Sequence, residues 1–121
     1  MSFVLRPLEF VRSSKKELLV LPDEVQQVFG YALFLAQTGR MHCSAKPLKG
    51  FGSAGVLEVV EDMRGDTYRA VYTVRLADAV YVLHCFQKKS KRGRETPQQT
   101  MELIRERLKE AERIAKERGN G

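Results

Sequence analysis

Basic residues gather in one stretch of the sequence, where they could bind phosphate groups. Residues 88–94 read KKSKRGR and hold five basic residues without an acid. The whole chain has 21 Lys and Arg residues against 15 Asp and Glu, which gives a formal net charge of +6. Positive charge confined to one segment is typical of a surface that neutralises phosphates. We therefore expect an anionic partner, contacted by Lys89, Lys91, Arg92 and Arg94.

Arg69 is a second feature that could do chemistry. It stands within TYRAVYTVRL (residues 67–76), a segment rich in β-branched and aromatic residues. A charge in such a strand is costly to bury unless its head reaches solvent or a partner. The guanidinium has a fork of donors that matches phosphate oxygens and stays charged. Arg69 is therefore a candidate for stabilising a reacting phosphate, and the alternative is a structural ion pair with Glu58 or Glu61.

His84 and Lys88 lie in the next strand-like segment. Side chains two apart on a strand share a face, so His84, Phe86 and Lys88 form one row. A free imidazole exchanges protons near neutral pH, so His84 could act as an acid or base, and Lys88 could donate a proton or bind phosphate. The alternatives are a hydrogen-bonded core histidine and a solvated strand end. Lys46 and Lys49, in a glycine-bearing loop, either contact the phosphates of an anionic partner or are ordinary surface lysines.

Local sequence patterns predict the elements that position these side chains. Their order is β-α-α-β-β-β-α, an α+β fold with an antiparallel sheet, an N-terminal helical hairpin and a C-terminal helix. Short connections at residues 64–66 and 77–78 favour a meander. The expected elements are a strand over Phe3–Leu5, a helix over Lys15–Leu21 capped by Ser13 or Ser14, a helix from Pro22 to Thr38, a loop over Arg40–Gly55, strands over Val56–Glu61, Thr67–Leu76 and Val80–Gln87, and a last helix that begins at Pro97 with Thr96 as its cap.

Two of the helical segments have a single apolar face, which is typical of helices that pack on a sheet. The length of 121 residues fits one hydrophobic core, so we expect a single domain over residues 1–121. The residues expected to form the apolar faces are Val25, Val28, Phe29, Ala32, Leu33 and Ala36 in the earlier helix and Met101, Ile104, Leu108, Ala111 and Ala115 in the last one.

Composition and cysteine usage favour a cytoplasmic protein. No apolar run reaches the roughly 18 residues that span a bilayer, and residues 1–10 lack the pattern of a signal peptide. We therefore expect no membrane contact. The two cysteines each follow a histidine, and the spacing of His42-Cys43 and His84-Cys85 matches no common zinc module. We expect two reduced thiols, no metal site and no cofactor.

Several short sequence motifs resemble those of the RelE/ParE toxins of bacterial type II toxin–antitoxin pairs, and most closely those of their phage-derived, HigB-like branch. The resemblance extends from about residue 13 to about residue 112, and the order and spacing of the motifs carry it more than any single one. The motifs are AKPLKG at residues 45–50, YRAVY at 68–72, YVLHCFQKKS at 81–90, and Thr96-Pro97 before a charged final helix.

The resemblance implies metal-independent cleavage of messenger RNA, usually on the ribosome, by a toxin that a cognate antitoxin, often a helix-turn-helix protein, silences. In that chemistry the 2′-hydroxyl attacks its own phosphate. The enzyme takes the hydroxyl proton, stabilises the phosphate charge and protonates the leaving 5′-oxygen. The catalytic candidates are Arg69, Lys88 and His84, and the residues expected to bind RNA phosphates are Lys46, Lys49, Lys89, Lys91, Arg92 and Arg94.

A different function on the same fold is the alternative. The ParE branch inhibits DNA gyrase and cuts nothing, so the fold alone does not decide the chemistry. Many family members carry an arginine two positions after the glutamate of the first meander strand, and here Val60 follows Glu58. A non-catalytic gyrase inhibitor or an inactive binding module therefore stays open as the second hypothesis. The basic KSKRGR insertion is also longer than in compact members, either for RNA contact or as a solvated loop.

Overall fold

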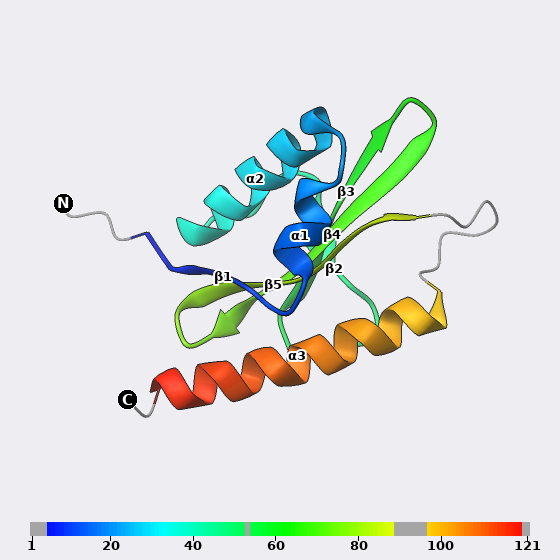
Figure 1. Cartoon of the computed structure of the whole chain (residues 1–121). Coiled ribbons are helices and arrows are strands. Elements are labelled where there is room, and N and C mark those ends of the chain that lie inside the picture. Colours follow the sequence, from blue (N-terminus) through cyan, green and yellow to red (C-terminus); the bar gives the residue numbers. More distant parts are fainter. Residues whose placement is uncertain (1–4, 53, 89–96, 120–121) are drawn as a thin grey trace.

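A five-stranded mixed sheet forms the centre of the fold in the computed structural model, which describes residues 5–52, 54–88 and 97–119 (Figure 1). The strand order across the sheet is β1-β5-β4-β3-β2. Two helices cover one face and the C-terminal helix covers the other. The strands are β1 (Leu8–Phe10), β2 (Ala45–Pro47), β3 (Val56–Met63), β4 (Asp66–Leu76) and β5 (Ala79–Lys88), and the helices are α1 (Ser14–Leu19), α2 (Asp23–Gln37) and α3 (Gln98–Gly119).

The predicted antiparallel meander is confirmed in β3, β4 and β5. Both connections are two-residue turns whose central residues have positive φ, as type I′ hairpin turns require. In the first, Arg64 and Gly65 have φ of 53° and 84°. In the second, Ala77 and Asp78 have φ of 48° and 56°. Residues without glycine's freedom thus adopt a left-handed backbone at the second turn, which carries a strain that glycine would relieve.

The prediction of a purely antiparallel sheet is wrong, because β1 pairs with β5 in parallel. The first strand also differs from the expected Phe3–Leu5. Leu5 is not in a strand, residues 3 and 4 lie outside the described residues, and the strand comes after Pro7, with Leu8 opposite Val80. A three-residue strand is too short to show an alternating pattern in sequence. Its pairing depends on a partner about 70 positions away, which local patterns do not report.

The segment expected to be a loop before the meander contains the edge strand β2. It pairs antiparallel with β3, with Lys46 opposite Glu58 and Pro47 opposite Leu57. Proline lacks an amide donor, and a sheet edge tolerates that loss. The rest of residues 40–55 connects α2 to β3 without further strands among the described residues.

The helices follow their predicted apolar faces. In α2 the buried side chains are Val25, Phe29, Ala32, Leu33 and Ala36, which pack on β3, β4 and β5. In α3 the buried side chains are Ile104, Leu108, Ala111 and Ala115, which pack on the opposite face. Both helices thus cover the sheet as their spacing predicted. Among the described residues, none of the helices is both long and apolar enough to cross a membrane.

Side chains take the place of a neighbouring strand along the second half of β5. β1 covers β5 only from Val80 to Val82. Beyond it, the Ser14 hydroxyl donates to the Val82 carbonyl at 3.1 Å, and the Cys85 amide donates to the Glu17 carboxylate at 3.3 Å. The Arg107 guanidinium donates to the Leu83 carbonyl at 2.9 Å. Backbone groups at a bare sheet edge need such partners, and these contacts bring α1 and α3 to the same point of β5.

Candidate active site

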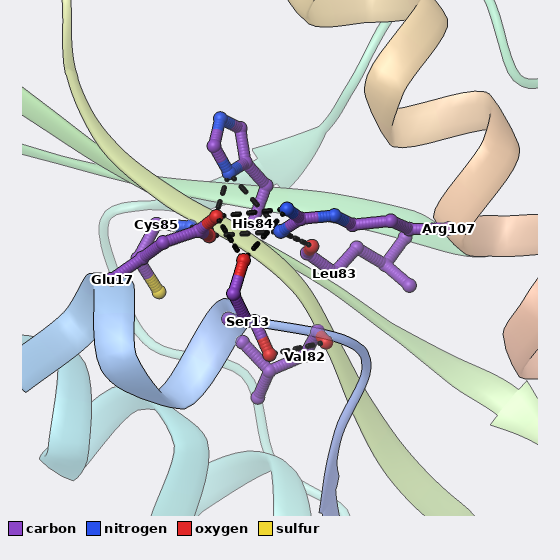
Figure 2. Close-up of polar contacts among 8 residues, drawn as sticks. Ser13, Glu17, Val82, Leu83, His84, Cys85 and Arg107 are labelled. Atoms are coloured by element: carbon purple, nitrogen blue, oxygen red, sulfur yellow. Dashed lines mark hydrogen bonds and ion pairs between the residues drawn. The ribbon is translucent and has the colours of Figure 1, made fainter.

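Glu17 of α1, His84 of β5 and Arg107 of α3 meet at this point (Figure 2). The Glu17 Oε1 atom lies 2.7 Å from Nδ1 of His84 and accepts from Nη1 of Arg107 at 2.9 Å. Nη2 of Arg107 lies 2.8 Å from Glu17 Oε2. The Ser13 hydroxyl also donates to Oε2 at 3.0 Å and accepts from Arg107 at 3.1 Å. The cluster therefore ties together three elements that are far apart in the sequence.

Glu17 is held as an anion. Burial alone would raise the pKa of its carboxyl group, but hydrogen bonds from His84 and Arg107 outweigh that effect and lower the pKa to about 2. Since the ionised carboxylate only accepts hydrogen bonds, the proton between the two residues belongs to Nδ1 of His84. The other ring nitrogen, Nε2, points away from Glu17 (Figure 2).

The His84 ring is also fixed by an aromatic neighbour. Its centroid lies 4.6 Å from that of Phe86, with 17° between the ring planes. The side chain is 14% exposed, so the imidazole lies near the surface without being free to rotate into solvent. An imidazole that is held at one nitrogen, and whose other nitrogen has no hydrogen-bond partner among the described residues, is suited to proton transfer.

The predicted site residues share one face of the sheet, in three successive rows of cross-strand neighbours. The first row contains Lys46, Glu58, Val71 and His84, from β2, β3, β4 and β5. The second contains Val60, Arg69 and Phe86, and the third contains Asp62, Thr67 and Lys88. Residues directly opposite on neighbouring strands project from the same face. Val71 packs with Ile104 of α3, so this is the face that α3 covers further along.

Arg69 is buried in an ion pair on this face. Its Nη1 atom lies 2.8 Å from Oε2 of Glu58, and the two residues are 7% and 4% exposed. Lys46 approaches the other carboxylate oxygen of Glu58, with Nζ 3.7 Å from Oε1. The structure thus has the ion pair that the sequence left as the alternative for Arg69. A direct role of Arg69 on a phosphate stays a prediction.

The other predicted cations have more varied positions. Lys88 lies at the end of β5, half-buried and opposite Thr67. Lys46 and Lys49 are exposed, on β2 and in the loop after it. Lys89, Lys91, Arg92 and Arg94 lie outside the described residues. The described part therefore brings Lys46, Arg69, Lys88 and His84 onto one face, and it leaves the basic run untested.

Glu17 and Arg107 were not found from the sequence. Glu17 is a helix-start acid like many others, and its contact with His84 spans 67 positions. Arg107 lies in a helix with many charges, and its contact with Glu17 spans 90 positions. Nothing in the local pattern distinguishes either residue from a solvated charge. Ser13 was expected as a helix cap, but its hydroxyl bonds to Glu17 and Arg107 and caps no backbone amide.

An open pocket of about 360 Å³ lies beside the cluster and is lined by Arg12, Leu103, Glu106 and Arg107.

The two His–Cys pairs of the sequence lie in different parts of the fold. His42 and Cys43 lie in the connection that follows α2, whereas Cys85 is buried in β5. Among the described residues, no group of three or more His, Cys, Asp or Glu side chains is placed to hold a metal ion.

Comparison with known proteins gives one finding. The family described as "Phage derived protein Gp49-like (DUF891)" matches residues 16–109. That range begins in α1 and ends within α3, so it includes Glu17, His84 and Arg107 as well as the meander. No curated protein and no solved structure gives a significant match to the chain.

Proposed function

Because the chain belongs to the Gp49-like phage-derived family, a family of RelE-like toxins, we propose that it is the toxin of a type II toxin–antitoxin pair and cleaves messenger RNA. Cleavage takes place on the ribosome and needs no metal ion. The partner that silences it is a cognate antitoxin, encoded beside it, of helix-turn-helix type. The protein acts in the cytoplasm, where its substrate is.

The observation that carries the nuclease proposal is the face formed by the three rows. It holds an imidazole, an aromatic ring and three cations within neighbouring register positions: His84, Phe86, Lys46, Arg69 and Lys88. Rows two residues apart along a strand are separated by about 7 Å and neighbouring strands by about 4.8 Å. His84 and Lys88 therefore lie within reach of one phosphodiester, whereas Lys46, three strands away on β2, is placed for a flanking phosphate. Glu58 offsets part of the charge, which leaves Lys46 and Lys88 as the cations nearest the surface.

His84 is the proton-transfer residue in this proposal. The 2′-hydroxyl loses its proton, its oxygen bonds to the adjacent phosphorus, and the bond from phosphorus to the 5′-oxygen breaks. The leaving 5′-oxygen takes a proton from the Lys88 ammonium, and the products are a 2′,3′-cyclic phosphate and a 5′-hydroxyl end. Lys88 stabilises the negative charge that builds up on the phosphate, and Lys46 binds a flanking phosphate. Arg69 acts indirectly: its ion pair holds the Glu58 carboxylate, and that carboxylate in turn positions the Lys46 ammonium.

Induced expression in bacteria tests the proposal. We expect growth to stop and transcripts to accumulate as fragments with 5′-hydroxyl ends, mapped by ligation-based sequencing. His84→Gln should abolish cleavage while circular dichroism still shows the wild-type fold. The matched control is His42→Gln, since His42 is the chain's other histidine. It should cleave like the wild-type.

The opposite result would favour a second function. Growth arrest with intact transcripts and inhibited DNA gyrase would identify a ParE-like inhibitor. The observation behind this second candidate is the low positive charge of the second row. Val60 lies directly opposite Arg69 and is uncharged, and Arg69 itself is paired with Glu58, so this row offers little charge to stabilise a reacting phosphate. If the His84→Gln variant folds and cleaves RNA as fast as the wild-type, His84 is not the proton-transfer residue.

The basic run supplies a separate measure of RNA binding. Changing Lys91, Arg92 and Arg94 together to Ser should weaken affinity for single-stranded RNA. It should also flatten the slope of log affinity against log salt concentration by about 2, because each phosphate contact contributes about 0.7 on a single strand. An unchanged slope would show that the run does not contact phosphates.

A further inference from the structure

We infer that Glu17 is a positioning residue that makes Nε2 of His84 the base for the 2′-hydroxyl proton. The inference rests on the proposed function and deepens it by naming the base and the group that orients it. The geometry that carries it is the short contact of 2.7 Å between the Glu17 carboxylate and Nδ1 of His84, inside a cluster closed by Arg107.

The carboxylate fixes which ring nitrogen carries the proton. In a neutral imidazole one nitrogen is a donor and the other an acceptor. Since Glu17 accepts at Nδ1, the lone pair of the neutral ring is on Nε2. In the part of the chain that the structure describes, Nε2 takes part in no hydrogen bond that competes for this lone pair. Nε2 is therefore ready to accept a proton from a substrate hydroxyl.

Arg107 keeps Glu17 in place and ionised. Its two terminal nitrogens contact both carboxylate oxygens, and one of them also holds the Leu83 carbonyl of β5. The backbone amide of Cys85 donates to the same Oε1 atom that His84 contacts. The Glu17 carboxylate is thus the shared acceptor for the donors of His84, Cys85 and Arg107. The carboxylate cannot rotate away from the imidazole without losing several of these bonds at once.

The charged groups that face the imidazole come from each element packed against it. The Glu17 carboxylate from α1 lies 2.7 Å from Nδ1, and Nη1 of Arg107 from α3 lies 3.4 Å from it. On β5 itself the neighbouring Cys85 is a buried thiol, and burial raises its pKa to about 12, so it stays uncharged. Glu17 is thus the nearest anion to the ring and stabilises the imidazolium that forms when the base takes its proton.

The first test measures the tautomer directly and needs no RNA. Nitrogen-15 NMR of the neutral rings should show His84 protonated at Nδ1. His42 is an internal reference with the opposite expectation, because its Nδ1 accepts from the Ser44 amide at 2.9 Å. With only two histidines in the chain, assignment is simple. A wild-type His84 protonated at Nε2 would overturn the inference, even if no variant of Glu17 can be folded.

The second test uses Glu17→Gln, which keeps the shape of the side chain but can donate to Nδ1 and reverse the tautomer. Its matched control is Glu9→Gln, because Glu9 also joins the N-terminal segment to α3, through Arg118 at 2.8 Å, but has no contact with His84. We expect Glu17→Gln to lower the single-turnover cleavage rate by about 10² to 10⁴-fold, and Glu9→Gln to leave it unchanged. Glu17→Asp, which retains the charge, should recover part of the loss.

The ring tautomer separates positioning from simple bracing of the fold. If Glu17 positions the imidazole, Glu17→Gln should change which ring nitrogen of His84 carries the proton, whereas a residue that only braces the fold would leave the tautomer unchanged. A Glu17→Gln variant that is folded, keeps the Nδ1–H tautomer and cleaves within twofold of the wild-type at every pH would overturn the inference. If the wild-type itself leaves RNA intact on ribosomes, the proposed function fails, and the tautomer measurement still decides whether Glu17 orients the ring.

Discussion

Acid should weaken this fold through Glu17, and replacing that residue should remove the effect. The carboxylate is 22% exposed and bound by His84 and Arg107, which hold its pKa at about 2 instead of the usual 4.5. A group whose pKa is lowered by folding stabilises the protein where it is ionised in both states. That contribution is present above the unfolded value of 4.5 and is lost as the pH falls towards about 2.

The size of the effect follows from the two pKa values. A fall from 4.5 to about 2 corresponds to about 3 kcal/mol of stability at neutral pH, at about 1.4 kcal/mol per pH unit. By the same linkage relation, about 2 kcal/mol of this is lost between about pH 7 and pH 3, and the remainder is lost at still lower pH. Glu17→Gln cannot lose this contribution because it has no proton to gain.

Urea unfolding of the wild-type and of Glu17→Gln at the two pH values measures the difference. Glu17→Gln is expected to be less stable than the wild-type at neutral pH, and the gap should narrow by about 2 kcal/mol at about pH 3. Glu9→Gln serves as the control because its ion pair with Arg118 is more exposed, and its gap to the wild-type should change little. Equal losses of stability with pH in the wild-type and in Glu17→Gln would refute the reasoning.

Three further predictions concern the turn, the buried ion pair and the thiols. Ala77→Gly should raise the free energy of unfolding by about 1 kcal/mol, since the left-handed φ of 48° costs alanine but not glycine; a lower thermal midpoint would contradict this. Arg69→Met should destabilise the fold by about 3–5 kcal/mol because it leaves Glu58 buried without its closest cation, and Glu58→Gln added to it should restore part of that loss in urea unfolding. Equal stability of the single and double variants would show that the two residues are not coupled. Cys43 is exposed and should react with a maleimide, whereas Cys85 is buried, with a pKa raised to about 12 by burial, and should react only on unfolding; mass spectrometry showing equal labelling of the native protein would be the contrary result.

The parts of the fold that the sequence predicted correctly are those with a strong local signal. The apolar faces of α2 and α3 repeat at helical spacing, and both are buried as expected. The meander has long strands with short turns between them, so its antiparallel pairing needed no distant information. The two strands that were missed, Leu8–Phe10 and Ala45–Pro47, have three residues each and are held by their partners rather than by their own pattern.

The candidate site was predicted in part for the same reason. His84, Phe86 and Lys88 lie on one strand, so their common face follows from alternation alone. The pairing of Arg69 with Glu58 was foreseen as an alternative because both residues belong to adjacent strands of the meander. The Glu17 and Arg107 contacts depend on how α1 and α3 dock on opposite sides of one strand, and that docking is decided by the packed core.

The side chains of Ser14, Glu17 and Arg107 that bond to the backbone of β5 also protect this edge of the sheet against aggregation. A strand with unpaired amides and carbonyls is a template on which a second chain can add, and the half of β5 beyond Val82 is protected by α1 and Arg107 instead of by a strand. The hairpins of the meander can be complete before those distant contacts form. Transient release of α1 therefore exposes unpaired backbone groups of β5 to which another chain can bind. Amide hydrogen exchange at Cys85 would report how often this release happens.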